Sequence, residues 1–186
     1  MGISAFLERK LAKRFETFDT NGDGAIERVD FELSVERMGR AFGLDADDAR
    51  LQRLRALSLG LWEHLASAAD RDGDGRIDLA EYEEAFVTGL LETPESFDQG
   101  YVPFLEAIFA IADTDGDGRL DVAEHIRWTG SLMNLPEADA RDIHRRLDRD
   151  GDGYIASRDL LDAIREFYFD EHPESAGSWL LGKLKG

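Results

Sequence analysis

The sequence of 186 residues contains no cysteine, which excludes disulfide bonds, thiolate metal sites and a cysteine nucleophile. It also has no apolar run long enough to cross a bilayer. Methionine and proline are scarce, with 3 and 4 residues. Hydrophobic residues still make up 42% of the chain, enough for a packed interior, so global disorder is not expected. The length fits one domain, or two small lobes that share a core.

Basic residues are fewer than acidic residues. Lys and Arg together number 22 against 40 Asp and Glu, which gives a formal net charge of -18. A surplus of this sign argues against a duplex-DNA partner, because a phosphate backbone attracts cationic surfaces. It favours cations instead, so we expect metal ions as partners, with no nucleic acid and no membrane.

One motif, D-x-[DN]-G-D-G, occurs four times. An aliphatic residue stands two positions after each second glycine, and a carboxylate stands four positions beyond that. The four loops so defined are 19–30, 70–81, 113–124 and 148–159. Their aliphatic residues are Ile26, Ile77, Leu120 and Ile155. We expect Ile26 to lie opposite Ile77, and Leu120 opposite Ile155, in short strand contacts between paired loops.

Apolar residues at helical spacing flank every loop, as Leu7, Leu11 and Phe15 do before the first. A long helix is expected around residues 46–69, with Asp45 as its N-cap. The middle connection holds breakers that one straight helix cannot cross, so the two halves should pack together. These breakers are Gly89, Pro94, Gly100 and Pro103. The prediction is an all-α protein with loop pairs in residues 1–93 and 94–169, followed by a tail over 170–186.

The loop pattern suits a hard cation. Ca²⁺ takes six to eight oxygen ligands, which a 12-residue loop supplies from positions 1, 3, 5, 7, 9 and 12. Position 6 must turn sharply, and glycine does so at low cost. Position 7 donates its backbone carbonyl, so its side chain is free to vary. The predicted ligands are Asp19, Asn21, Asp23, Ala25, Asp30, Asp70, Asp72, Asp74, Arg76, Glu81, Asp113, Asp115, Asp117, Arg119, Glu124, Asp148, Asp150, Asp152, Tyr154 and Asp159.

The distribution of charge supports the same reading. Eighteen of the 40 acidic side chains stand at ligand positions, and the remaining 22 equal the number of Lys and Arg. The whole net charge is therefore located in the loops. Two carboxylates 4 Å apart repel by about 4 kcal/mol at an effective dielectric of about 20. Empty loops should open, so we expect metal binding to be coupled to folding.

The loops are not equivalent. Loops 2 and 3 end in Glu81 and Glu124, whereas loops 1 and 4 end in Asp30 and Asp159. A shorter side chain reaches the ion poorly with both oxygens, and six-coordination is what Mg²⁺ prefers. The hypothesis is that loops 2 and 3 are selective for Ca²⁺, while loops 1 and 4 are weaker or bind both ions. The alternative is that backbone adjustment brings the Asp close enough, less so in loop 4, which has Ala156 at position 9.

These loops resemble EF-hands residue by residue. The long first interval, the broken middle connection and the Asp that ends the first loop resemble the family of sarcoplasmic calcium-binding proteins and calerythrin. The resemblance implies a compact helical globule that acts as an intracellular Ca²⁺ buffer or sensor. Relatives often have a degenerate second loop, whereas loop 2 is complete here, so up to four Ca²⁺ sites are expected, with Mg²⁺ also in loops 1 and 4.

Two roles remain open at this stage. A sensor of the calmodulin type exposes a Met-rich groove, and this chain has few Met, which favours a buffer with a fixed core. The apolar cluster Trp179, Leu180 and Leu181 could fold back and plug a groove, and the other reading is a frayed terminus. Docking would suit a buffer, or a sensor whose groove is released by an unidentified protein target.

An enzyme is not expected, because the four His residues show no metal-ligand or catalytic spacing. A remote alternative is a chromophore-binding module of the photoprotein kind. Its cavity would be lined by Trp62, His64, Trp128 and Trp179. The opening helix, with Glu8 and Arg9, does not look like a signal peptide. We therefore expect a cytoplasmic monomer.

Overall fold

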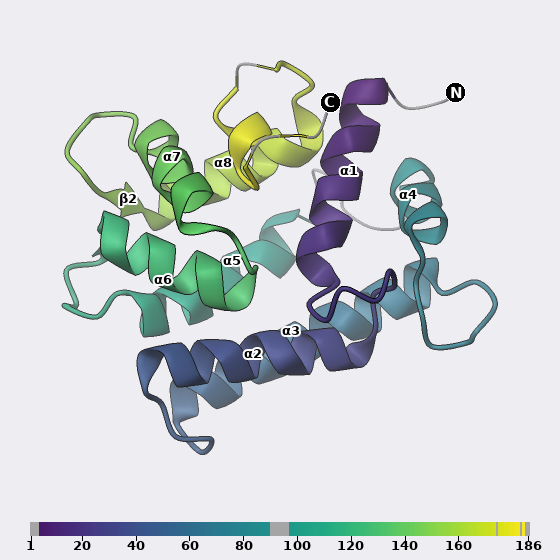
Figure 1. The fold of residues 1–186 in the computed structure, drawn as a ribbon, viewed down its shortest axis with the longest axis horizontal. Helices are drawn as coiled ribbons and strands as arrows, with labels where there is room; N and C mark the ends of the chain where they lie inside the picture. The colour runs from purple at the N-terminus through teal and green to yellow at the C-terminus, as the bar shows by residue number, and fades with distance from the viewer. Residues whose placement is uncertain (1–3, 90–96, 174, 183, 185–186) are drawn as a thin grey trace.

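The computed structural model describes residues 4–89, 97–173, 175–182 and 184. Within them the regular secondary structure is almost entirely helical (Figure 1), which confirms the predicted class. The elements are α1 (Ala5–Phe18), α2 (Arg28–Phe42), α3 (Ala49–Ala69), α4 (Leu79–Val87), α5 (Phe97–Ala112), β1 (Arg119–Leu120), α6 (Val122–Leu132), α7 (Glu137–Leu147), β2 (Ile155–Ala156), α8 (Ser157–Phe169) and a 3₁₀ turn, η1 (Gly177–Trp179). None of the helices, searched over the described residues, is long and apolar enough to cross a membrane.

The loops pair as the sequence predicts. Ile26 and Ile77 form an antiparallel bridge, with N···O distances of 2.9 and 3.0 Å. Strands β1 and β2 are antiparallel and place Leu120 opposite Ile155. All four aliphatic side chains are fully buried. The first pair of loops is therefore joined by a single bridge and the second by two short strands, and in both the apolar side chains are buried in the core.

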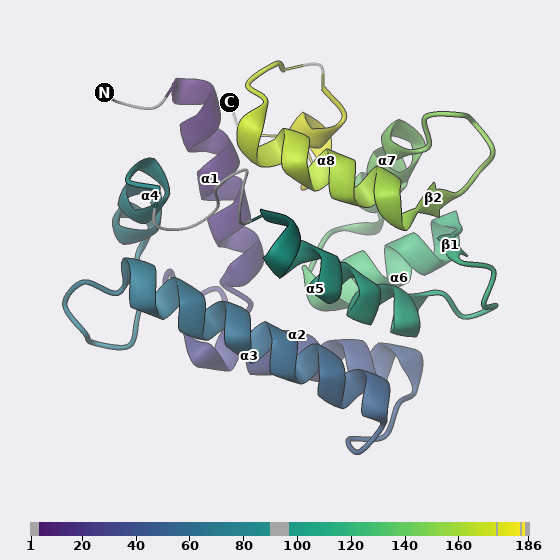
Figure 2. The same cartoon turned by 180° about the vertical axis from the view of Figure 1, so that it is seen from behind.

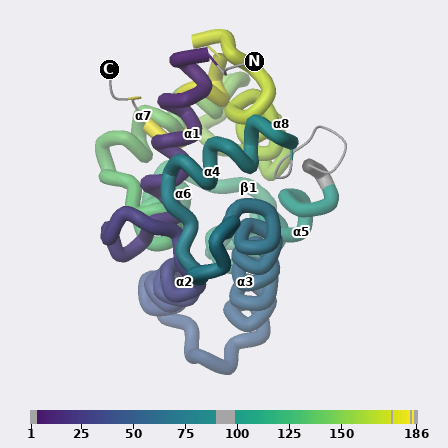
Figure 3. Tube along the Cα trace, turned by 90° about the vertical axis from the view of Figure 1, so that its right-hand side faces the viewer, coloured from purple at the N-terminus to yellow at the C-terminus, as the bar shows by residue number. Residues whose placement is uncertain are grey.

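The two halves of the chain interlock. Helices α2 and α3 pack against each other, and they also contact the second half, α2 through α6 and α3 through α5. Figure 2 shows α3 alongside α5 from behind, and Figure 3 shows the α2–α3 pair below the remaining helices. The expectation that the halves pack together is confirmed.

The buried apolar residues fall into two clusters. The smaller one belongs to the first pair of loops and includes Leu11, Phe15, Trp62 and Tyr82. The larger one joins residues of the second half to the end of α2 and the start of α3. Those from the first half are Val35, Met38, Leu51 and Leu54. The α2–α3 hairpin thus contributes to the core of both halves.

Some predicted helix ends are wrong. Helix α3 begins at Ala49 with Asp48 as its N-cap, whose side chain accepts a hydrogen bond from Arg50 N. Asp45 instead starts a preceding turn, because its carbonyl accepts from Asp48 N at 3.0 Å.

The middle connection is broken as expected, since α4 ends at Val87 and α5 begins at Phe97, but not every breaker lies at a break. Gly89 follows the end of α4 with a φ of 72°. Pro103 does not end a helix, since it lies inside α5, as Gly100 does. Pro94 lies outside the described residues.

The C-terminal segment contacts α8 and α7. Gly177 N donates to Glu166 Oε2 at 3.0 Å, and the Arg146 guanidinium lies 3.8 Å from the centroid of the Trp179 ring. Leu180 and Leu181 are buried in the larger cluster. A Cβ at position 177 would lie 2.4 Å from Glu166 Cβ and 2.5 Å from Ala163 O, so this close approach needs glycine.

Lys10 joins the first helix to the last. It is fully buried, and its Nζ donates to Asp170 O at 2.7 Å and to Glu166 O at 3.3 Å, at the end of α8. Cations are favourable at a helix C-terminus. Burial nevertheless lowers the pKa of Lys10 to about 8, and the nearby carboxylates of Asp170, Glu171 and Glu166 oppose that shift.

This lowered pKa predicts a rise in stability at alkaline pH. Between about pH 8 and 10.5 the unfolded chain keeps the Lys10 proton while the folded chain has lost it, so the free energy of unfolding increases with pH. Denaturant unfolding of the wild type and Lys10→Met across this range should show a smaller rise in the variant. Lys13→Met is the matched control and should follow the wild type. Parallel curves for wild type and Lys10→Met would contradict the expectation.

Candidate metal centres

Each loop begins at the end of one helix and finishes in the first turn of the next. Asp19, Asp70 and Asp148 cap the C-terminal ends of α1, α3 and α7, and Asp113 N bonds back to Phe109 O in α5. The position-12 carboxylates lie in the first turns of α2, α4, α6 and α8. The first and last ligands are thus carried by two different helices, whose relative angle must suit the ion.

Backbone amides hold the first carboxylate of every loop. In loop 2, Asp70 accepts from Gly73 N at 2.8 Å and from Gly75 N at 3.0 Å. Equivalent pairs of bonds occur in the other three loops. Gly75 has a φ of 83°, a left-handed conformation that a side chain would strain. This explains the invariable second glycine of the four motifs.

The glutamates at position 12 reach back across their loops. Glu124 accepts from Thr114 N at 2.7 Å through one oxygen and from Asp121 N at 3.1 Å through the other. Glu81 has the same pair of bonds, from Arg71 N and Asp78 N. Both oxygens of each glutamate are therefore fixed facing the loop, the arrangement needed for bidentate binding.

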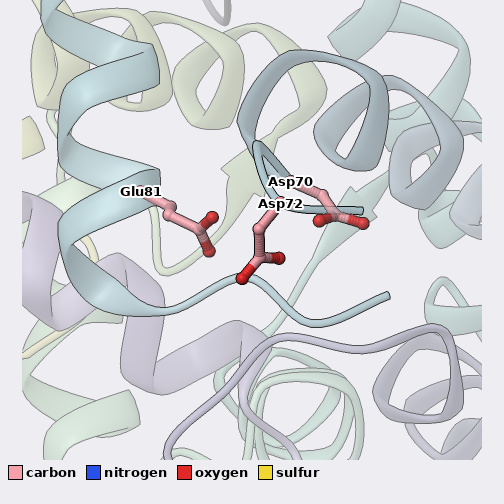
Figure 4. A group of neighbouring side chains, drawn as sticks. All are labelled: Asp70, Asp72 and Glu81. Carbon is pink, nitrogen blue, oxygen red and sulfur yellow. The ribbon is translucent and has the colours of Figure 1, made fainter. Parts of the chain in front are cut away.

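In three loops the carboxylate oxygens converge. Asp70, Asp72 and Glu81 offer oxygens within 4.8 Å of one another, and Figure 4 shows the three side chains pointing toward a common space, Glu81 from its helix and the others from the loop. Oxygens that share one Ca²⁺ at about 2.3–2.6 Å can lie no more than about 5 Å apart. The residues therefore fit a hard divalent cation. The other groups are Asp113, Asp115 and Glu124, and Asp148, Asp150 and Asp152.

Loops 1 and 4 differ from this arrangement. In loop 4 the converging group does not include Asp159. In loop 1 the predicted carboxylates form no such group among the described residues. Asp30 is fully buried, and burial raises its pKa, opposed by hydrogen bonds from Glu27 N and Asn21 N. Loop 1 has Asn21 in place of the position-3 carboxylate, and Asp30 keeps the same pair of amide bonds as the glutamates, from Asn21 N at 3.1 Å and Glu27 N at 2.8 Å.

Two features of the loops were missed by the sequence analysis. The Asp at position 9 also serves as a helix N-cap: Asp121 accepts from Ala123 N and Glu124 N. Ala156 cannot do this for α8. The position-7 side chains are also less free than expected, since Arg76 and Arg119 form ion pairs with the neighbouring loop. Position 7 directly precedes the paired aliphatic residue, a spacing that signals proximity to the partner loop.

Comparison with known proteins agrees with this geometry. An EF-hand family model matches residues 11–32, 67–87 and 105–124. Calerythrin of Saccharopolyspora erythraea is 30% identical over 167 residues, which covers 89% of this chain and 94% of calerythrin.

Solved structures are similar over most of their length. A Streptomyces coelicolor calcium-binding protein, described as acting in prokaryotic calcium-mediated regulation, has a TM-score of 0.73 and 36% identity over 87% of this chain and 97% of its own. A sarcoplasmic calcium-binding protein of amphioxus has a TM-score of 0.72 at 21% identity, over 98% and 99% of the two chains, and this likeness shows the fold alone.

The fold and its loops define a calcium-binding protein built from EF-hands. The chain belongs to the EF-hand family that includes calerythrin and the sarcoplasmic calcium-binding proteins. The protein therefore binds calcium through its EF-hand loops. The members of this family are not enzymes, and neither is this protein. When bound, the ion supplies positive charge that offsets carboxylate repulsion, while the chain supplies the oxygens and fixes their positions.

The tethered glutamate predicts a loss of affinity when its charge is removed. Glu124→Gln replaces a carboxylate that faces the loop with both oxygens by a neutral amide. One Ca²⁺ site should weaken by at least about tenfold, or roughly 1.4 kcal/mol, in calorimetric titration. The matched control is Asp121→Asn, which keeps a side-chain oxygen for the N-cap and should change affinity far less. Equal effects of the two substitutions would contradict the bidentate role.

Proposed function

We propose that the protein is an intracellular Ca²⁺ buffer in which ion binding is coupled to folding. The observation that carries this proposal is the burial of its apolar faces. Large apolar side chains that are exposed, among the described residues, are Val29, Val87 and Phe169, and they lie far apart in the sequence. A sensor needs a contiguous apolar surface to present to a target. Met38 is fully buried, so it is not available to such a surface.

The proposal includes up to four ions with unequal loops. Loops 2 and 3 are the Ca²⁺-selective sites because their tethered glutamates are one methylene longer than Asp30, which is held by the same pair of amides. Loops 1 and 4 bind more weakly and accept Mg²⁺ as well. The side chain of Asp159, which accepts from Ala156 N at 3.0 Å, is one methylene shorter than those of the glutamates, which supports this difference.

A specific observation favours a second role, that of a calcium sensor. The Streptomyces coelicolor relative is described as acting in calcium-mediated regulation and shares 36% identity with this chain. In such a role the C-terminal segment would occupy the groove that a target takes. Leu180 and Leu181 line a cavity between the two halves together with Phe104, Trp128 and Ile164, so their displacement would expose apolar surface.

The same cavity bears on the chromophore-binding alternative. Of the four aromatic candidates from the sequence, Trp128 alone lines it, and His64 is exposed. Its volume is about 70 Å³, less than half of the roughly 150 Å³ that accommodates a benzene molecule. An occupant larger than a few water molecules would have to displace the side chains around it. These observations do not favour a chromophore.

Buffer and sensor differ in how a hydrophobic dye responds. Titration with Ca²⁺ in millimolar Mg²⁺, followed by Trp fluorescence and dye binding, should show ion uptake with little dye response. A large dye signal that rises with calcium in the range of about 10⁻⁷–10⁻⁵ M would instead identify a sensor.

A variant that displaces the C-terminal segment shows how large the dye signal is when this apolar surface is exposed. Gly177→Ala places a methyl group 2.4 Å from Glu166 Cβ and 2.5 Å from Ala163 O. It should displace the C-terminal segment, raise dye binding without calcium, and lower stability by about 1–3 kcal/mol. Gly60→Ala, where nothing lies within 4 Å of the added atom, is the matched control and should leave dye binding unchanged.

Lengthening the position-12 side chain tests the difference between loops. Asp30→Glu and Asp159→Glu should shift loops 1 and 4 toward Ca²⁺ over Mg²⁺, because the longer carboxylate reaches an ion with both oxygens. Calorimetry with each ion measures the ratio of affinities, which should rise by about tenfold, or roughly 1.4 kcal/mol. An unchanged ratio would show that backbone adjustment already brings the aspartates close enough.

A further inference from the structure

An arginine occupies position 7 in only one loop of each pair. Arg76 stands in loop 2, whose partner has Ala25 there, and Arg119 stands in loop 3, whose partner has Tyr154. Both arginines directly precede the residue that pairs with the other loop. The strand contact therefore carries each guanidinium toward the neighbouring metal loop.

The contacts are equivalent in the two pairs. Arg76 lies 3.4 Å from Asp23 Oδ1 and 3.1 Å from Glu27 Oε1 in loop 1. Arg119 lies 2.9 Å from Asp152 Oδ2 in loop 4. Asp23 and Asp152 are the position-5 ligands of their loops. The same type of residue thus contacts the same ligand carboxylate in both halves of the molecule.

Two further contacts fix Arg119 in place. Its guanidinium carbon lies 4.1 Å from the centroid of the Tyr154 ring, within the range of a cation–π interaction. Its Nη2 lies 3.4 Å from Asp117 Oδ2 in its own loop. Arg119 therefore lies between the position-5 carboxylates of both loops of the pair, and its contact with Asp152 in loop 4, at 2.9 Å, is the closer of the two.

Such pairs contribute little to stability by themselves. The arginine side chains are 45% and 43% exposed, and exposed ion pairs typically contribute less than about 1 kcal/mol. Their position gives them a different effect. A guanidinium on a ligand carboxylate reduces the repulsion inside an ion-free loop, and it repels an arriving divalent cation. Both effects lower the affinity of the loop that receives the arginine.

We propose that Arg76 and Arg119 weaken ion binding in loops 1 and 4, so that loops 2 and 3 fill first. This inference rests on the proposed function of the four loops as ion sites. Each arginine belongs to a loop that ends in glutamate and acts on one that ends in aspartate. The charge and the shorter side chain therefore act in the same direction, and together they spread the four sites over a range of affinities.

The test removes each charge without removing a ligand. Arg76→Gln and Arg119→Gln keep the backbone carbonyl, and the wild type and both variants are titrated with Ca²⁺. The amides of Gly24, Gly75, Gly118 and Gly153, which donate to the first Asp of their own loops, report the filling of each loop by ¹⁵N NMR. Calorimetry reports the affinities. Loop 1 should bind about three- to tenfold more tightly in Arg76→Gln, and loop 4 in Arg119→Gln.

Two arginines at position 2 provide matched controls. Arg71 pairs with Glu84, and Arg149 pairs with Glu166 at 2.6 Å, and neither partner is a predicted ligand. Arg71→Gln and Arg149→Gln remove the same charge from the same loop pairs and should leave the order of filling unchanged.

The inference is overturned if the position-7 variants fill loops 1 and 4 at wild-type calcium concentrations, or if the position-2 variants shift them equally. Loops that bind no calcium in the wild type would instead refute the proposed function, so the two failures are distinguishable.

Discussion

Repulsion among converged carboxylates is the constraint on which the rest of the molecule depends. Asp70, Asp72 and Glu81 bring oxygens within 4.8 Å of one another, which is costly unless positive charge is near. Backbone amides supply part of that charge, as at Glu124, which accepts from two of them. A divalent cation supplies the remainder. Because each loop joins two helices, the charge balance inside a loop bears directly on the two helices that carry its first and last ligands.

The helical class and the pairing of the loops could be predicted because both follow from short repeated patterns. Ile26 opposite Ile77 and Leu120 opposite Ile155 depend only on their place after the second glycine. The helix ends were less predictable. Asp45 and Asp48 are both good N-cap residues, and only the turn between them, closed by the Asp48 N to Asp45 O bond, determines which one begins α3. Pro103 lies within α5, although the sequence places it among the residues that one straight helix cannot cross.

The candidate sites were likewise predictable only in part. The carboxylates of loops 2, 3 and 4 converge as their spacing suggests, because backbone amides of the loop itself orient them. Contacts between loops are not encoded in that spacing. Arg76 reaches Asp23 across 53 residues of sequence, and only the antiparallel bridge brings them together.

The contact of Lys10 with the end of α8 has a consequence for biosynthesis. Its carbonyl partners lie 156 and 160 residues further along the chain, so the first helix cannot complete this contact until Asp170 has left the ribosome. Closing so large a loop is also entropically demanding. During translation the ammonium group of Lys10 must therefore stay hydrated, and its transfer from water to these two carbonyls can only follow the synthesis of α8.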